Sequence, residues 1–343
     1  MQIEKNLCMY FSFRNVIRTL SSILIFSIVN ILGAQSESGL NLEALTLPDS
    51  YGFKKWGLEL SSVTKLNDSY YAVSEKCKLI FQFKIEADRI KVDSVIYLGN
   101  HPMWSDPVAI EGVATYGDQL IMIDEGTDAG AEAYAKLYTY DTKSSALNMI
   151  FVDGADKYLQ GWTGNYGAEG IAVDETNDVL YVLNEKNRTT DNAGFATLIS
   201  YDIMGTNTII NLLPKDTLSI QLADGERLSD LHYSRVSRKL HTIKVNYHER
   251  KGNSEERSKY EVCTLEFAND GDASVVDCKN FTKELITEID YDGNTGYRTS
   301  TNIEGLVVDE DGSILIVSDN ARTDKCCDEN VMGESGMFKL SMQ

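Results

Sequence analysis

Ala168-Glu169-Gly170-Ile171-Ala172-Val173 is the stretch that decides the fold, because four other segments of the chain share its form. In each, one Ser or Glu and one small or polar residue precede alternating apolar residues, which is typical of a β-strand. The five segments are Leu58–Val63, Ala109–Ala114, Ala168–Val173, Arg227–His232 and Asn302–Val307. This recurrence predicts one supersecondary unit that is used several times.

A turn and a second apolar run follow each of these segments. The runs are Tyr70–Val73, Leu120–Ile123, Val179–Leu183, Leu240–Ile243 and Ile314–Val317. Each pair predicts a β-hairpin, and a third run such as Leu79–Phe83 usually follows. The repeats are 50, 58, 60 and 75 residues apart, which fits one four-stranded blade per repeat. We therefore expect an all-β chain folded as a β-propeller, most simply with five blades, or with six if the longest span holds two.

The composition agrees with an ordinary globular protein, since 43% of the 343 residues are hydrophobic and 24% are charged. The chain has 25 Gly but only 4 Pro, which favours strands joined by tight turns over helix bundles. The net charge of −20 argues against nucleic-acid binding, because phosphate backbones are bound largely through Lys and Arg.

The N-terminal segment has the order of a secretory signal. Arg14 and Arg18 precede an apolar stretch from Leu20 to Leu32, and the small pair Gly33-Ala34 precedes a polar run. The alternative is a membrane anchor, but this stretch is shorter than the roughly 20 residues that span a bilayer. We expect residues 1–34 to be a signal peptide and residues 35–343 a single propeller domain, secreted and not associated with a membrane after signal removal.

Cysteine usage fits an oxidising compartment. Cys263 and Cys278 lie in neighbouring strand-like segments joined by a turn, so a cross-strand disulfide is expected. One member of the adjacent pair Cys326-Cys327 is expected to bridge to Cys77, which leaves one thiol free or paired outside the chain. Three sequons predict N-glycosylation in a eukaryotic host, at Asn67, Asn187 and Asn280.

The candidate metal ligands occupy the same position in each repeat. They are Ser61, Glu111, Glu169, Ser229 and Glu304. In a propeller the innermost strands line the central channel, so three carboxylates would converge on one axis and repel each other. A cation resolves this repulsion, and Ca²⁺ prefers such hard oxygen donors. The sequence therefore predicts a calcium site in the channel. The alternative is a hydrated channel without an ion, or hydrogen bonds that cap strand ends.

A second acidic set ends the second strand of four repeats, 14 to 16 residues after the channel position: Glu75, Glu125, Glu185 and Asp319. These residues should gather at one end of the disc, where basic neighbours such as Lys186 could help to bind a phosphate or polar ligand. The alternative is that each acid pairs with a nearby Lys or Arg or caps a turn. The chain has no His-Glu-x-x-His or Gly-x-Ser-x-Gly motif. If a general base exists, His248 is the best candidate, because it lies beside Glu249-Arg250 at the expected end of a blade.

The repeated Glu-Gly segments, with Val-Ser-Glu, Ile-Asp-Glu, Leu-Asn-Glu and Val-Ser-Asp after them, resemble the SdiA-regulated and esterase-like-phytase families of calcium-associated propellers. The Ser, Glu, Glu, Ser, Glu order and Glu59-Leu60-Ser61 are more distantly similar to the calcium-activated nucleotidases (apyrases). The Asp-Asp-Arg-Thr-Gly segment of those nucleotidases appears here as Ser74-Glu75-Lys76-Cys77-Lys78, so nucleotide hydrolysis is not implied. The resemblance covers about residues 56–340.

Two functions fit these features. The first is a secreted calcium-dependent hydrolase that acts on an ester or phosphoester of a small molecule, with the ion polarising the substrate oxygen. The second is a noncatalytic propeller with structural calcium, in which the end of the disc binds a protein, a glycan or a small molecule.

Overall fold

The computed structural model describes residues 40–48, 60–74, 77–99, 109–125, 135–152, 167–184, 194–206, 209–223, 225–246, 259–268, 272–281, 286–291, 294–299, 302–319 and 336–342. Within these ranges the chain forms strands and turns and no helix, which confirms the all-β expectation. Accordingly, this part of the chain offers no helix with the length and apolar character needed to cross a membrane. The expected signal peptide, residues 1–34, lies outside the described residues.

The described strands build up antiparallel units of four. The first unit contains β2 (Leu60–Leu66), β3 (Ser69–Ser74), β4 (Leu79–Glu86) and β5 (Arg89–Tyr97). The second contains β6 (Ile110–Tyr116), β7 (Gln119–Asp124), β8 (Lys136–Asp141) and β9 (Leu147–Met149). The third contains β11 (Ala168–Asp174), β12 (Val179–Asn184), β13 (Phe195–Thr206) and β14 (Ile209–Gln221).

The fourth unit occupies much of the 75-residue span between Ser229 and Glu304. It contains β15 (Glu226–Ser234), β16 (Lys239–Asn246), β17 (Lys259–Phe267) and β18 (Asp272–Asn280). Strand β18 pairs in parallel with β14, and β10 (Phe151–Val152) also pairs with β14, so the third and fourth units form one nine-stranded sheet. The rest of the span adds a separate two-stranded sheet of β19 (Ile286–Tyr291) and β20 (Asn294–Thr299).

The last unit joins both ends of the described chain. It contains β21 (Asn302–Val308), β22 (Ile314–Asp319), β23 (Gly336–Met342) and, as its outermost strand, β1 (Leu40–Ala44). The chain then continues from β1 onto the first unit, where the Thr46 N–H donates to the Asp88 carbonyl at 2.7 Å. The sequence repeats do not predict β1, because it is a short strand that carries no copy of the motif.

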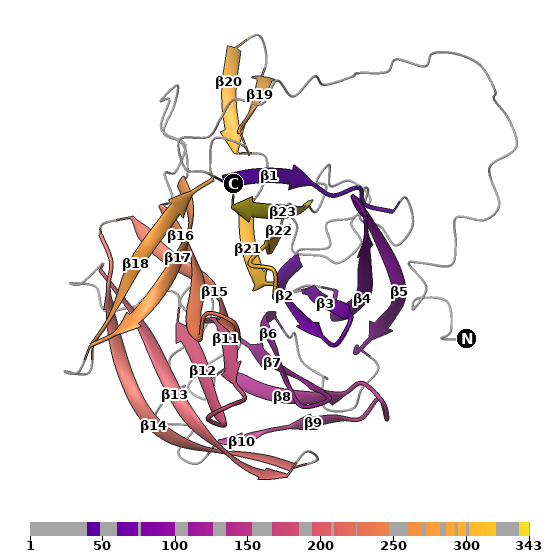
Figure 1. Ribbon diagram of the computed structural model, residues 1–343, viewed down its shortest axis with the longest axis vertical. Helices are drawn as coiled ribbons and strands as arrows, with labels where there is room; N and C mark the ends of the chain where they lie inside the picture. The colour runs from indigo at the N-terminus through magenta and orange to yellow at the C-terminus, as the bar shows by residue number, and fades with distance from the viewer. Residues whose placement is uncertain are drawn as a thin grey trace, which may run out of the picture.

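The innermost strands form a closed ring around one axis. Strands β2, β6, β11, β15 and β21 contact each other in this order, and β21 contacts β2 again (Figure 1). Their side chains alternate between two neighbouring cores: Ile171 and Val173 pack against the second unit, whereas Ala172 packs against the fourth. Five buried clusters of this kind separate successive units. Each innermost strand is therefore buried between two neighbouring cores, and the arrangement is that of a β-propeller.

The Cys263–Cys278 disulfide is confirmed, with a Cα–Cα distance of 4.1 Å between β17 and β18. Cys77 is buried and also disulfide-bonded. Its expected partners, Cys326 and Cys327, lie outside the described residues, so that pairing stays a prediction.

Candidate functional site

Four of the five predicted channel residues lie where the innermost strands depart from regular pairing. In β15, Ser229 pairs with Ile243 and the bulged residue is Asp230. In β2 the register shifts between Leu60 and Ser62, so Ser61 is the bulged residue. Glu111, Glu169 and Glu304 occupy the corresponding bulges of β6, β11 and β21. A β-bulge re-aims its side chain away from the regular alternation. The repeated Glu therefore leaves the face of its sheet without disturbing the apolar residues that follow it.

The structure brings the three glutamates together. A carboxylate oxygen of each of Glu111, Glu169 and Glu304 lies within 4.8 Å of the others. Glu111 is buried with 5% exposure, and the other two are half-buried. Strand β21 is not a neighbour of β6 or β11 in the ring, so this glutamate cluster spans the central channel.

The two predicted serine ligands hold neighbouring strands. The Ser61 hydroxyl donates to the Ile110 carbonyl at 2.5 Å, and the Ser229 hydroxyl donates to the Ile303 carbonyl at 3.3 Å. Each acceptor immediately precedes a glutamate of the cluster. These bonds match the strand-capping alternative and fix the backbone from which Glu111 and Glu304 project.

Asp230, which sequence reasoning missed, lies in the next layer of the ring. It is fully buried, and its two oxygens accept hydrogen bonds from the Ser62 hydroxyl at 3.0 Å and the Leu306 N–H at 2.8 Å. It therefore connects β15 with β2 and β21. Loss of water raises the pKa of Asp230 well above its usual range, and the charge of Glu304 raises it further, against the hydrogen bonds that it accepts.

A sequence signal for Asp230 exists. The position after the channel residue is Ser62, Gly112, Gly170 or Gly305 in the other repeats, and only here a charged residue. The small residues are needed because the backbones nearly touch. A Cβ on Gly170 would lie 2.5 Å from the Asp230 carbonyl carbon, and one on Gly305 would lie 2.7 Å from the Ser62 Cα.

Arg227 and Asn302 approach one member of the glutamate cluster. The Arg227 Nη2 lies 3.8 Å from the Glu304 Oε1, and the Asn302 side-chain amide donates to the same oxygen. The Arg227 guanidinium also donates to the Asn302 Oδ1 at 3.2 Å. The Arg227 guanidinium therefore offsets part of the negative charge of the three carboxylates.

The second acidic set is only partly described. Glu125 follows β7 and is half-buried, and its N–H donates to the Ala109 carbonyl at 3.0 Å. Asp319 is the last residue of β22 and pairs through its backbone with Asn302. Glu75, Glu185 and His248 lie outside the described residues. Strands β3 and β12 end opposite the starts of β2 and β11, so the strands before Glu75 and Glu185 end at the level of the cluster.

The donor set fits a hard cation. The cluster offers only carboxylate oxygens, which suit Ca²⁺ with its 6–8 oxygen ligands at about 2.3–2.6 Å better than metals that prefer nitrogen or sulfur. Glu261, Cys263 and Cys278 form another group with metal-binding residue types, but its two sulfurs are joined in the disulfide and cannot act as thiolates.

Comparison with known proteins gives one family. A family model described as "Phytase-like: Esterase-like activity of phytase" matches residues 56–321. This match confirms the esterase-like-phytase part of the resemblance, whereas the SdiA-regulated and nucleotidase parts stay predictions. No curated protein sequence matches the chain.

Several solved structures are similar at low identity. Glutaminyl cyclase from Myxococcus xanthus is 11% identical with a TM-score of 0.45, over 88% of this chain and 94% of that one. The soluble aldose sugar dehydrogenase of Escherichia coli in its apo form is 8% identical with a TM-score of 0.45, over 89% of this chain and 100% of that one. A Bacteroides ovatus GH43B protein of a xyloglucan locus is 10% identical with a TM-score of 0.47, over 88% of this chain and 54% of that one. At these values none of them says what this chain does.

Proposed function

This chain belongs to the phytase-like family, and from that membership we propose that it is a secreted, calcium-dependent hydrolase of a small-molecule ester or phosphoester. The observation that carries the proposal is the glutamate cluster across the channel, whose oxygens lie within 4.8 Å of one another. The description of the family names an esterase-like activity, which supports the choice of reaction.

Glu111, Glu169 and Glu304 would hold the ion. Calcium, when bound, polarises a substrate oxygen and lowers the pKa of a bound water. The residues of the chain have separate parts in this arrangement. The serine bonds to the Ile110 and Ile303 carbonyls fix two of the ligand-bearing strands, and Arg227 offsets part of the cluster charge.

Acid–base chemistry would come from the residues that follow the second strands. Glu125 and Asp319 adjoin the start of β6 and β21, where the glutamate cluster begins. We assign Glu75, Glu125, Glu185 and Asp319 as candidates to position water or accept its proton, with His248 as a further candidate base. Glu185→Gln is the most informative single change among them, and we expect it to reduce turnover without changing stability.

We also propose five blades and a mature chain that starts at Gln35. The five innermost strands contact each other in succession and close the ring, which supports the count within the described residues. Intact mass of the secreted protein tests the start, since a mass that still includes residues 1–34 would refute removal of a signal peptide.

A substrate screen with and without calcium tests the reaction. The purified mature chain is assayed on aryl esters, lactones, phosphomonoesters, phosphodiesters and nucleotides, each with added calcium and with chelator. We expect turnover of at least one class that chelator abolishes and calcium restores. Glu169→Gln should lower this rate at least about tenfold, because it weakens the metal site. Glu266→Gln is the matched control, since Glu266 is 56% exposed on β17.

Two results would contradict the proposal. One is turnover that neither chelator nor Glu169→Gln affects. The other is a wild type that is inert on every class with calcium present, which would favour the noncatalytic binding propeller.

A further inference from the structure

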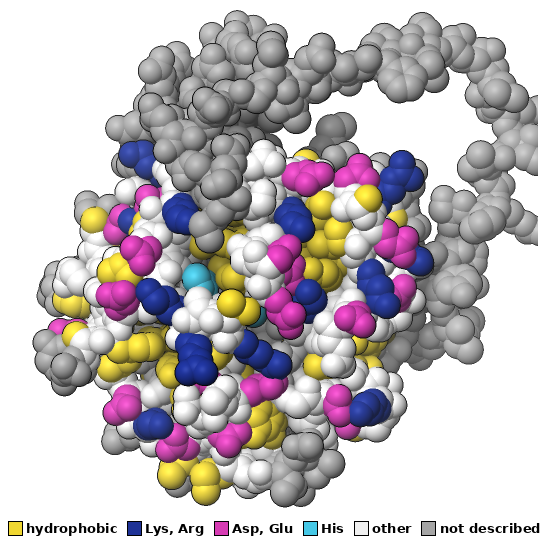
Figure 2. Space-filling view, in the orientation of Figure 1, with side chains coloured by type: hydrophobic (Ala, Val, Ile, Leu, Met, Phe, Trp, Pro, Cys, Tyr) yellow, Lys and Arg dark blue, Asp and Glu magenta, His cyan; other side chains and the backbone are white. Residues whose placement is uncertain are grey.

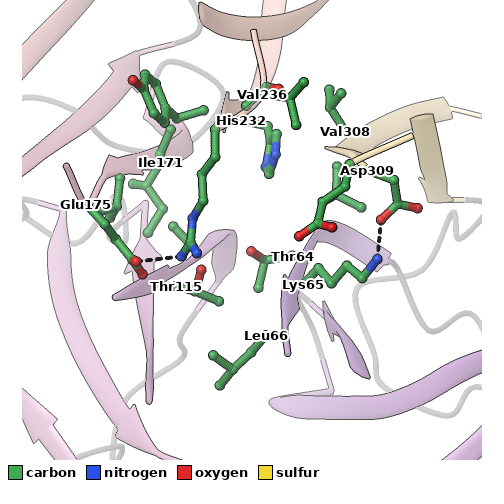
Figure 3. A pocket seen from close by; sticks show the side chains of 18 of the residues that line it. Thr64, Lys65, Leu66, Thr115, Ile171, Glu175, His232, Val236, Val308 and Asp309 are labelled. Atoms are coloured by element: carbon green, nitrogen blue, oxygen red, sulfur yellow. Dashed lines mark hydrogen bonds and ion pairs between the residues drawn. The ribbon is translucent and has the colours of Figure 1, made fainter. Parts of the chain in front are cut away.

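A cavity lies at the end of the innermost strands opposite the glutamate cluster. It has a volume of about 330 Å³ and is lined in part by Thr64, Thr115, Ile171, His232 and Val308 (Figure 3). The turn after each innermost strand contributes one lining residue six positions beyond the channel residue: Asn67, Gly117, Glu175, Arg235 and Glu310. At about 3.3 Å per residue, these turns lie roughly 20 Å along the strands from the glutamate cluster. They form the rim of the cavity, here called the far mouth, and the cavity extends inward from them as far as Ile171.

The cations of the far mouth are already neutralised. Arg235 Nη2 lies 2.5 Å from Glu175 Oε2, and Lys65 Nζ lies 2.6 Å from Asp309 Oδ1 (Figure 3). The other oxygen of each carboxylate is also held. The Tyr70 hydroxyl donates to Asp309 Oδ2 at 2.5 Å, and the Gly117 N–H donates to Glu175 Oε1 at 3.1 Å. A free anion would therefore have to displace a carboxylate that two donors fix.

The polar groups between these ion pairs are uncharged. His232, Thr64 and Thr115 point toward the middle of the cavity (Figure 3). Burial lowers the pKa of His232 to about 3, with His241 and Arg235 adding to the effect, so the imidazole is neutral at pH 7. Its ring donates a hydrogen bond to the Val308 backbone carbonyl. Both acidic and basic side chains are interspersed around the visible histidines on the face shown in Figure 2.

We propose that the far mouth binds a neutral, hydroxyl-rich molecule of about monosaccharide size. Each hydroxyl of such a ligand both donates and accepts hydrogen bonds. The two ion pairs retain N–H groups of Lys65 and Arg235 beside carboxylate oxygens, so donors and acceptors are both present. With Glu310 the lining carries two cations and three carboxylates, a formal net charge of 2 − 3 = −1, which favours a neutral ligand over an anion. Ile171 and Val308 give an apolar surface for the C–H face of a ring, and the volume lies at the lower end of the range for small-molecule sites.

Matched pairs of neutral and anionic sugars test the proposal. The mature protein is titrated with D-glucose, D-xylose and myo-inositol, and with glucose 6-phosphate and glucuronate, by calorimetry or ligand-observed NMR. We expect a neutral member to bind with a Kd on the order of 1 mM, since a ligand this small gains little affinity per atom. The anionic counterparts should bind more weakly.

Variants locate the site. Thr64→Val removes the hydroxyl of Thr64, a residue with 2% exposure, at nearly constant volume. Arg235→Ala removes a side chain that is 67% exposed. Each should weaken binding about fivefold, which corresponds to one lost hydrogen bond. Lys215→Ala is the control, because Lys215 forms a comparable exposed ion pair with Asp202 at 2.9 Å, and neither residue lines the cavity. Glu169→Gln should also bind the sugar normally, so this result stands apart from the fate of the proposed hydrolase.

Three outcomes would overturn the proposal. They are no binding of any neutral probe, tighter binding of an anionic probe than of its neutral counterpart, and unchanged binding in Arg235→Ala. If Thr64→Val fails to fold, Arg235→Ala still decides, since its exposed side chain is dispensable for packing.

Discussion

The two ends of the central channel are built by the same five strands but differ in how their charged side chains are arranged. At the cluster end, three carboxylates converge within 4.8 Å and one guanidinium approaches one of them. At the far mouth, each cation meets a carboxylate at 2.5 or 2.6 Å. The far mouth thus pairs Lys65 and Arg235 with carboxylates, whereas the cluster end gathers three carboxylates of like charge.

The size of the repulsion explains why this difference matters. Two unit charges 4.8 Å apart repel by about 3 kcal/mol at an effective dielectric constant of about 20. Three such repulsions together are comparable to the whole free energy of unfolding of a typical domain. A bound cation would offset this repulsion, which is the physical basis for proposing a calcium site there.

Glycine substitutions should give the largest difference between the two ends. A Cβ on Gly170 would lie 2.5 Å from backbone atoms of Asp230 and Leu231, so Gly170→Ala should lower the free energy of unfolding by about 3 kcal/mol. Gly117, at the far mouth, has a φ of +59° and open space around it. Gly117→Ala should therefore cost only the backbone strain, about 1 kcal/mol. Urea unfolding measures both.

Equal losses in the two glycine variants would break this comparison. If Gly170→Ala fails to fold, limited proteolysis of the expressed protein still separates it from a folded Gly117→Ala. A Gly170→Ala variant as stable as wild type would mean that the innermost strands do not approach closely below the cluster.

Calcium should stabilise the protein through the cluster end alone. An ion bound only by the folded state adds about 2.7 kcal/mol at a hundredfold excess over its Kd. Chelator should lower the Tm of the wild type, and Glu169→Gln should lose most of the calcium-dependent shift. Glu266→Gln should keep the full shift, because Glu266 is an exposed residue of β17. A Glu169→Gln variant with the wild-type shift would place the ion elsewhere.

The sequence predicted the cluster end better than the far mouth for a physical reason. Glu111, Glu169 and Glu304 repeat in kind, so aligning the repeats shows that they converge. At the far mouth the same repeat position is filled by residues of different types, so it gives no such signal. These residues are Asn67, Gly117, Glu175, Arg235 and Glu310. Its ion pairs join residues of different repeats, for example Lys65 and Asp309, whose proximity depends on closure of the ring.

Other features escaped prediction for related reasons. Asp230 is identifiable only as an exception to a row of small residues, and its burial depends on three strands meeting at the axis. Strand β1 has no motif, and its partner β23 is almost 300 positions away in the chain. By contrast, hairpins such as β11–β12 and the Cys263–Cys278 link are local, so alternation and turn residues were sufficient to predict them.

Lowering the pH should change the stability contributions of His232, in the far cavity, and of Asp230, beside the cluster, in opposite directions. The pKa of His232 is about 3 in the folded state against about 6.5 when unfolded, so the unfolded state binds the proton first as pH falls. Its stability contribution is present above pH 6.5 and is lost toward pH 3, with about 1–2 kcal/mol lost by pH 5. The pKa of Asp230 is raised, so its contribution is instead present at low pH and lost as pH rises through that pKa.

Comparing variants isolates the histidine. Urea unfolding of wild type and His232→Asn at pH 7, 6 and 5 should show a smaller loss of stability in the variant. His241→Asn is measured beside it, because His241 also has a pKa lowered by burial, to about 4, and adds its own loss of stability in acid. His241 is the cross-strand neighbour of His232, so the two variants separate the two contributions. Identical pH profiles for wild type and His232→Asn would show that His232 titrates normally in the folded state.

The exposed ion pair of the far mouth should contribute least to stability. Arg235 is 67% exposed and Glu175 is 24% exposed, so Arg235→Ala should change the free energy of unfolding by less than about 0.5 kcal/mol, as for other surface pairs. The same variant should weaken binding of a neutral sugar at the far mouth. Urea unfolding and sugar titration on one preparation separate the two effects. A large stability loss would mean that this pair holds the end of the channel together, and the far mouth would then resemble the cluster end, where charged residues are tied to the integrity of the ring.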